Sequence, residues 1–112
     1  KLEIFPGYKT AMITLTREEL NRYHYRKGDS EGLVNVPLSI EGVVFSAFFR
    51  EEKEYIKVSL RSKGNFPANK VASEYFNGGG HMNAAGGEFY GTMEEIIERF
   101  KNLLPMYVQY LQ

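Results

Sequence analysis

The residues best suited to chemistry lie in one short stretch, residues 78–87, which reads Gly-Gly-Gly-His-Met-Asn-Ala-Ala-Gly-Gly. It holds five of the eleven glycines and one of the two histidines. The three successive glycines Gly78, Gly79 and Gly80 open the main-chain N–H groups to close approach, and successive N–H groups in a turn can bind an anion. His81 directly follows these glycines and is the only ionisable side chain in the stretch. An anion-binding loop is one interpretation. A helix end is the other, because many helices stop at a glycine.

Arg61 is the second candidate, at the end of a predicted strand. Residues 55–61 alternate between polar and apolar side chains, which predicts that Ile56, Val58 and Leu60 face the core and Arg61 points the other way. A guanidinium group can bind two oxygens of one phosphate. From its position alone, a solvated strand end is the simpler explanation of Arg61.

Periodicity and capping signals predict the elements that position these residues. Strands are predicted at residues 8–15, 42–50, 55–61 and 87–90. The second of these is apolar almost throughout, which favours burial on both faces. Helices are predicted at residues 17–25, 30–35 and 70–77, and from residue 93 to Pro105.

The predicted caps are a capping box at Thr16 with Glu19, a second box at Thr92, and Asn69 as the N-cap of helix 70–77. That helix leads into the glycine stretch, but its C-terminal end carries negative dipole. The N–H groups after it are the better anion donors if residues 81–85 start a helical turn. The small Ala84 and Ala85 would let such a turn pack closely against a sheet or a ligand.

Composition limits the classes of protein that the chain can represent. Its 112 residues suit a single compact domain, and we expect an α+β fold with a mixed sheet of four or five strands and helices packed against it. Residues 1–7 are interpreted as the end of an inter-domain linker and residues 8–112 as the domain, within a fragment of a larger protein. The net charge of zero disfavours a tight duplex binder, and no apolar run is long enough to span a membrane.

Metal chemistry is also restricted by composition. The chain has no cysteine, a single Asp (Asp29) and two histidines, His24 and His81. A dinuclear phosphoesterase site gathers several Asp and His ligands, so we expect this chain to bind no metal itself. His24, near the end of a predicted helix, is interpreted as a surface residue.

The order of the motifs resembles the C-terminal substrate-binding domain of the DHH phosphoesterases. Ser-Leu-Arg-Ser at 59–62 precedes an Asn-led helix, and Gly-Gly-Gly-His at 78–81 is followed by Ala-Ala-Gly at 84–86. The resemblance covers about residues 10–100. A similar domain closes alanyl-tRNA synthetases, where the His after the glycines is usually replaced, so His81 favours the phosphoesterase branch.

The resemblance implies an activity and site residues. In the family, an N-terminal domain with an Asp-His-His motif binds two Mn²⁺ ions, and substrate binds between the two domains. The oligoribonuclease and pAp-phosphatase branch, often labelled exopolyphosphatase-related, is the most similar. Short RNA or 3′-phosphoadenosine 5′-phosphate (pAp) is then the expected substrate of a cytoplasmic enzyme, and the fragment alone should be inactive.

The resemblance makes Arg61 a phosphate-binding residue. It makes Gly78 to His81, beside Ala84 and Ala85, the part that closes on the substrate phosphate, with His81 as a hydrogen-bond donor or a proton shuttle.

Other interpretations remain open at this stage. The substrate could instead be cyclic di-AMP or polyphosphate. The domain could also be a non-catalytic RNA-binding module, like that of the synthetase. The apolar segment 106–111 leaves a homodimer open, although it serves equally well to cap the core.

Overall fold

The computed structural model describes residues 1–22, 33 and 35–111. Its sheet has six strands in the order β1-β2-β3-β4-β6-β5. The strands are β1 (Leu2–Phe5), β2 (Thr10–Leu15), β3 (Phe45–Glu51), β4 (Ile56–Ser62), β5 (Gly79–His81) and β6 (Ala84–Phe89). Strands β2 and β3 pair parallel, and every other neighbouring pair is antiparallel. The α+β class with a mixed sheet is confirmed, but the sheet has six strands rather than four or five.

One extra strand comes from the N-terminal segment. Residues 1–7 were expected to be a linker, but Leu2–Phe5 pairs with β2 as an edge strand. The N-terminal ammonium of Lys1 donates to the Thr14 carbonyl oxygen at 2.7 Å, and the Phe5 ring lies 6.3 Å from that of Phe100. Pairing to the sheet and packing on the core therefore hold this segment in the domain.

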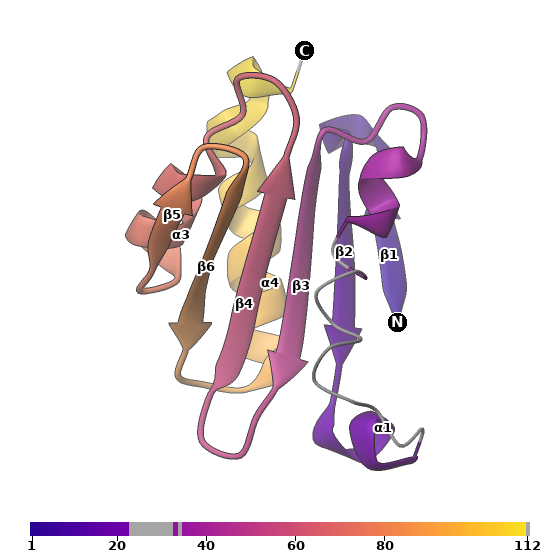
Figure 1. Cartoon of the computed structure of the whole chain (residues 1–112), viewed down its shortest axis with the longest axis vertical. Coiled ribbons are helices and arrows are strands. Elements are labelled where there is room, and N and C mark those ends of the chain that lie inside the picture. The colour runs from indigo at the N-terminus through magenta and orange to yellow at the C-terminus, as the bar shows by residue number, and fades with distance from the viewer. Residues whose placement is uncertain (23–32, 34, 112) are drawn as a thin grey trace.

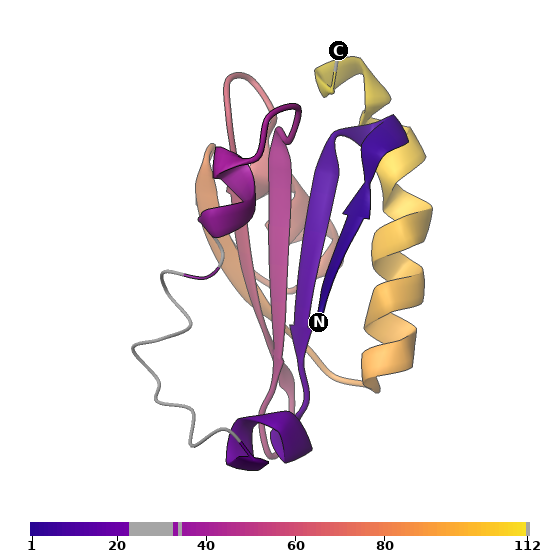
Figure 2. The same cartoon turned by 90° about the vertical axis from the view of Figure 1, so that its right-hand side faces the viewer.

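The helices lie on two sides of the sheet (Figures 1 and 2). Helix α4 (Met93–Leu103) runs along one face, with α3 (Ala68–Tyr75) beside it, and the short helix η2 (Val36–Ser39) lies on the opposite face over β3. Helix α1 (Arg17–Arg22) follows β2, and the 3₁₀ helix η3 (Leu104–Tyr110) continues α4. His24, most of the predicted helix at 30–35 and the predicted end of helix 17–25 lie outside the described residues.

Both predicted capping boxes are present. Thr16 and Glu19 exchange backbone-to-side-chain hydrogen bonds of 2.9 and 3.1 Å, and Thr92 and Glu95 do the same at 2.8 and 3.1 Å. Within α4 the apolar side chains Ile96, Phe100 and Leu103 are buried, and Met93 and Ile97 pack against the core partly buried. Among the described residues, no helix combines the length and apolarity that crossing a membrane requires.

The predicted Asn69 cap is wrong. Helix α3 begins at Ala68, so Asn69 lies in its first turn, and no side chain caps the helix. Instead, the Ala68 N–H donates to the Met82 carbonyl oxygen at 2.8 Å. A distant backbone group thus satisfies one of the free donors at this helix end.

The core fills the space between the sheet and helices α3 and α4. Phe45 stacks on Phe66 with ring centroids 4.1 Å apart, and Phe49 meets Phe100 edge-on at 5.4 Å. Strand β3 is buried on both faces, as its apolar sequence predicted. Strand β4 alternates as predicted, with its apolar residues in the core and Lys57, Ser59 and Arg61 on the other face. We call the part of that face formed by β4, β6 and β5 the open face.

Candidate functional site

The glycine-rich stretch forms a β-hairpin. Strand β5 pairs antiparallel with β6, with Gly79 opposite Gly86 and His81 opposite Ala84, and Met82-Asn83 forms the two-residue turn. Residues 81–85 therefore do not form the helical turn considered as one possibility, and the strand expected from residue 87 begins at Ala84. Because small residues occupy both strands, the two backbones can lie flat against α3 and β4 without displacing larger side chains.

The glycines of the hairpin serve different purposes. A Cβ atom at Gly78 would collide with the Gly86 carbonyl oxygen, and one at Gly87 would collide with the Phe76 carbonyl oxygen. Gly80 has φ of +142°, and a Cβ there would lie 2.7 Å from the Ala85 Cα. At Gly79, in contrast, a Cβ would meet nothing within 4 Å. Packing therefore explains the other glycines but leaves the absence of a side chain at Gly79 unexplained.

The helix end itself is made by Asn77 rather than by a glycine. Asn77 adopts the left-handed conformation with φ of +50°, and the Gly78 N–H donates to the Ala72 carbonyl oxygen at 3.0 Å. This is the arrangement that closes many helices, with the left-handed residue one position earlier than the sequence suggested. Gly78 directly follows this turn. It does not line the surface depression beside Arg61 that is described below.

Strand pairing brings Arg61 and His81 into one row. Both are register partners of Ala84, Arg61 from β4 and His81 from β5. Adjacent strands lie about 4.8 Å apart, so the two backbone positions are separated by roughly 10 Å. The next row holds Ser59, Gly86 and Gly79. The result is a floor of small residues with a guanidinium on one side and an imidazole on the other.

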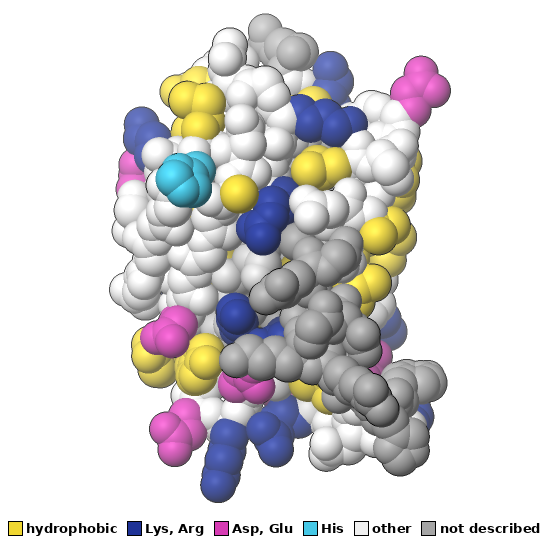
Figure 3. Space-filling view, viewed as in Figure 1, with side chains coloured by type: hydrophobic (Ala, Val, Ile, Leu, Met, Phe, Trp, Pro, Cys, Tyr) yellow, Lys and Arg dark blue, Asp and Glu magenta, His cyan; other side chains and the backbone are white. Residues whose placement is uncertain are grey.

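This floor is the bottom of a depression of about 550 Å³. Its lining includes Lys57, Arg61, Gly79, Gly80, Ala84, Ala85 and Gly86. Figure 3 shows the surface over β5 and β6 as mostly backbone, with a histidine side chain at its upper end and Lys or Arg side chains along β4. Ala85 contributes only backbone here, because its side chain is buried in the core.

The Arg61 side chain is held by the backbone and keeps most of its donors. Its Nη1 atom donates to the Leu60 carbonyl oxygen at 2.8 Å and to that of Ala85 at 3.4 Å. Of the carboxylates in the described ranges, none lies within ion-pair distance of Arg61, whereas the Arg50 guanidinium is paired with Glu52 at 2.7 Å. A guanidinium carries five N–H donors, so Arg61 retains donors and an uncompensated charge for an anion.

His81 is exposed at the end of β5. Within the part of the chain that the structure describes, its imidazole makes no hydrogen bond and no ion pair. It does not line the depression itself, so it would contact only a ligand that extends past Ala84 to the end of β5. Its role as a donor or as a proton shuttle stays a prediction.

Sequence reasoning missed the residues that hold the hairpin in place. The Asn83 side-chain amide donates to the Ser62 hydroxyl at 2.9 Å and to the Gly64 carbonyl oxygen at 3.1 Å. The Ser62 N–H donates in turn to the Asn83 carbonyl oxygen at 3.0 Å. A polar Asn in a two-residue turn, and a Ser at the end of an alternating strand, were the available signals. Lys57 was also not predicted as a site residue, although the same alternation places it on the open face.

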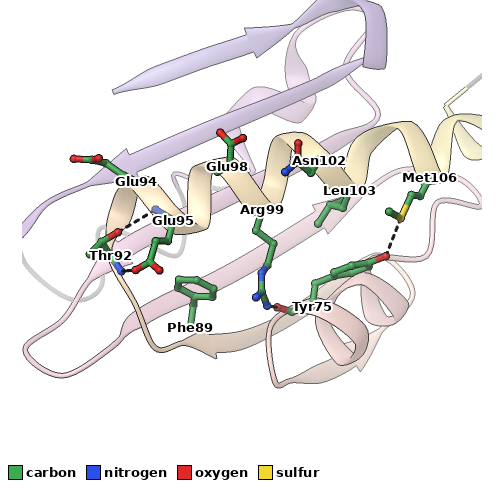
Figure 4. Close-up of a pocket in the computed structure, with 10 residues that line it drawn as sticks. All are labelled: Tyr75, Phe89, Thr92, Glu94, Glu95, Glu98, Arg99, Asn102, Leu103 and Met106. Carbon is green, nitrogen blue, oxygen red and sulfur yellow. Dashed lines mark hydrogen bonds between the residues drawn. The ribbon is translucent and has the colours of Figure 1, made fainter.

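A larger depression, of about 880 Å³, lies on the opposite side of the sheet. Figure 4 shows that some of its polar groups are hydrogen-bonded to one another, whereas Glu94, Glu98 and Asn102 have no bond drawn to another lining residue. Arg99 donates to the Tyr75 carbonyl oxygen at 3.1 Å and lies 5.1 Å above the Phe89 ring, while the Tyr75 hydroxyl contacts the Met106 sulfur at 3.1 Å. None of the candidate site residues predicted from the sequence lines it. We therefore place the candidate site on the open face.

The site does not fit a resident metal ion. Its strong donors are a single imidazole beside the cations Arg61 and Lys57, which would repel a divalent ion. Across the described ranges, no group of three or more His, Cys, Asp or Glu residues could hold one.

A family model described as the DHHA1 domain matches residues 10–109. The chain therefore belongs to the DHHA1 domain family, as the resemblance indicated.

Curated relatives carry a specific activity in their names. The bifunctional oligoribonuclease and PAP phosphatase NrnA of Thermus thermophilus is 39% identical over 72 residues, covering 63% of this chain and 22% of the relative. The protein of the same name from Bacillus subtilis is 31% identical over 84 residues, covering 75% of this chain and 26% of the relative. The chain thus spans about a quarter of the length of these relatives.

A solved structure shares the whole fold. The crystal structure of an exopolyphosphatase-related protein from Bacteroides fragilis superposes with a TM-score of 0.95 at 55% sequence identity. The match covers 99% of this chain and 33% of that protein. The six-stranded arrangement is thus shared with a similar protein of known structure.

Proposed function

We propose that this chain is the substrate-binding domain of a DHH-family phosphoesterase that hydrolyses short RNA oligonucleotides, pAp or both. The observation that carries the proposal is the row in which Arg61 and His81 flank Ala84 beside Gly79. The names of the NrnA relatives support the substrate class.

The chemistry of the row suits a phosphate. Arg61 supplies charge-assisted hydrogen bonds from a fixed position, because two backbone carbonyls orient its guanidinium. The open surface at Gly79 lets a phosphate approach the backbone closely. His81 donates a hydrogen bond from the other side. One preorganised donor of this kind contributes about 3–4 kcal/mol to stabilising a charged transition state.

The catalytic centre of the proposal lies in another domain of the same polypeptide. An N-terminal DHH domain would hold two Mn²⁺ ions, which supply an activated water and neutralise charge on the phosphate. This chain then contributes binding and orientation alone, and by itself it hydrolyses nothing. The partial coverage of the NrnA relatives leaves room for such a domain, and we place the whole enzyme in the cytoplasm.

The test uses the full-length protein with Mn²⁺ and a panel of RNA dinucleotides, pAp, cyclic di-AMP and polyphosphate. We expect mononucleotide from the dinucleotides and AMP from pAp. If only cyclic di-AMP or only polyphosphate is hydrolysed, that compound replaces RNA and pAp as the proposed substrate. If nothing in the panel is hydrolysed, the phosphoesterase proposal fails, and RNA titrated onto this domain would test a binding module instead.

A further inference from the structure

Two tyrosines are the aromatic residues that the described structure leaves accessible on the open face. Tyr55 directly precedes β4 and continues the alternation that points Lys57 and Arg61 outward. Tyr90 directly follows β6 and donates from its hydroxyl to Glu88 Oε1 at 2.7 Å. Their rings are 6.2 Å apart. The other aromatic residues of the described ranges are buried or pack against the core.

We propose that Tyr55 and Tyr90 form a stacking subsite for the base of a distal nucleotide in a short single-stranded RNA bound at Arg61. The inference rests on the proposed function and adds a second contact for its substrate. Tyr90 is 65% exposed, so a face of its ring is available to a base. Stacking on an aromatic ring tolerates every base, because each has a π-face.

The spacing selects oligonucleotides over mononucleotides. Tyr55 lies six residues before Arg61, which along a strand is roughly 20 Å. Between them the floor is low, since Gly86 lies opposite Ser59, and the Lys57 ammonium is available to a backbone phosphate. A mononucleotide with its phosphate at Arg61 is too short to reach the rings, whereas an oligonucleotide along β4 and β6 is long enough.

Two carboxylates close to the Tyr90 ring favour a base at that position rather than another phosphate. Glu88 accepts a hydrogen bond from the Tyr90 hydroxyl, and Glu54 lies in the β3–β4 hairpin connection, directly before Tyr55. The hydrogen bond to Glu88 is the main reason that the pKa of Tyr90 is raised, and the charge of Glu54 adds a smaller effect. These carboxylates repel a phosphate but not a neutral base. Figure 3 shows the hydrophobic group at the lower end of this face with both acidic and basic side chains around it.

The experiment compares two substrates in the full-length protein, an RNA pentanucleotide and pAp. In Tyr90→Ala we expect the ratio of kcat/KM for the pentanucleotide to that for pAp to fall about 5- to 150-fold, mainly through KM, as the loss of one stacked base predicts. Tyr55→Ala should lower the same ratio. Tyr90→Phe keeps the ring and should keep the ratio. Met106→Ala removes a similarly exposed apolar side chain from the opposite side and should also keep it.

The outcomes separate this inference from the proposed function. If the wild-type protein hydrolyses both substrates and Tyr90→Ala leaves the ratio unchanged, the stacking subsite is wrong while the proposed function stands. A Tyr90→Phe variant as impaired as Tyr90→Ala would also overturn it, since the effect would then come from the bond to Glu88. If the wild-type protein hydrolyses neither substrate, the proposed function fails and this inference fails with it.

Discussion

Asn83 donates a 2.9 Å hydrogen bond to the Ser62 hydroxyl and thereby ties the tip of the β5–β6 hairpin to the end of β4. The two residues continue the register just beyond the last pair of β4 and β6, Arg61 with Ala84, and the Ser62 N–H also donates to the Asn83 carbonyl oxygen at 3.0 Å. Their bond fixes the end of the row that contains Arg61 and His81. The geometry of the candidate site therefore depends on a contact outside it.

Replacing Asn83 by alanine tests this dependence. Asn83→Ala removes the bonds to Ser62 and Gly64, and we expect a loss of about 1–2 kcal/mol in the free energy of unfolding. The KM for pAp should rise as well, because the hairpin tip is released. Denaturant unfolding and steady-state kinetics measure the two effects. Asn65→Ala, an exposed Asn in the loop before α3, is the control and should change neither. Equal stability of the two variants would contradict the anchoring role.

The glycines Gly79 and Gly80 form a matched pair. Gly79→Ala adds a methyl group where there is open space, so we expect an unchanged melting temperature and weaker substrate binding. Gly80→Ala places a Cβ against Ala85 in a left-handed conformation, which should cost about 1–3 kcal/mol of stability. Thermal melts and KM for pAp distinguish the two. Normal binding by Gly79→Ala would mean that no ligand approaches the backbone at that position.

Arg61 should affect activity far more than stability. In the full-length enzyme, Arg61→Ala should lower kcat/KM for pAp by roughly 10²- to 10³-fold, the usual effect of losing one preorganised donor. Arg61→Lys should recover little, because lysine lacks the planar fork that binds two oxygens. Arg22→Ala, which removes an exposed arginine paired with Glu18, is the control and should behave as the wild type. Unimpaired kinetics in Arg61→Ala, and likewise in His81→Ala, would remove both residues from the site.

Because of the capping box of α4, the free energy of unfolding should depend on pH in the acidic range. Hydrogen bonds from the Thr92 backbone and then from its side chain lower the pKa of Glu95 below its usual 4.5. A lowered pKa in the folded state means that the stabilisation is complete above the ordinary pKa and is lost as pH falls through the lowered value. Glu95→Gln should therefore be less stable than the wild type at pH 7, and this difference should shrink below pH 4.5. Denaturant midpoints across this range measure the effect, with Glu94→Gln as the neighbouring control. A constant difference between Glu95→Gln and wild type would contradict the assignment.

Local patterns in the sequence were enough to predict several elements. The alternation at residues 55–61 predicted both strand β4 and the direction of Arg61, because a strand turns successive side chains to opposite faces. Thr92 and Glu95 predicted the start of α4. The apolar residues 43–49 predicted a strand covered on both faces. Each of these signals is carried by side chains that are close together in the chain.

The glycine-rich hairpin and strand β1 could not be predicted in this way. Glycine and alanine give no hydrophobic period, so residues 78–87 do not reveal whether they form a turn or a strand. Strand β1 is short and largely exposed, and it is ordered by pairing with β2 and by the packing of Phe5 on Phe100. The first-turn position of Asn69 likewise follows from a distant partner, since Met82 binds the Ala68 N–H.

By itself, the sequence determined the α+β class, the family and the residue types able to bind a phosphate, because composition, short-range periodicity and motif order carry that information. Only the tertiary structure decided that Arg61 and His81 share one row and that Gly79 alone among the three successive glycines faces open space. It also decided that Tyr55 and Tyr90 lie together at one end of the open face. The physical reason is that these relationships arise from the antiparallel pairing of β4, β6 and β5. Pairing between distant segments depends on backbone hydrogen bonds and on close packing against α3, and neither is visible in the local pattern of side chains.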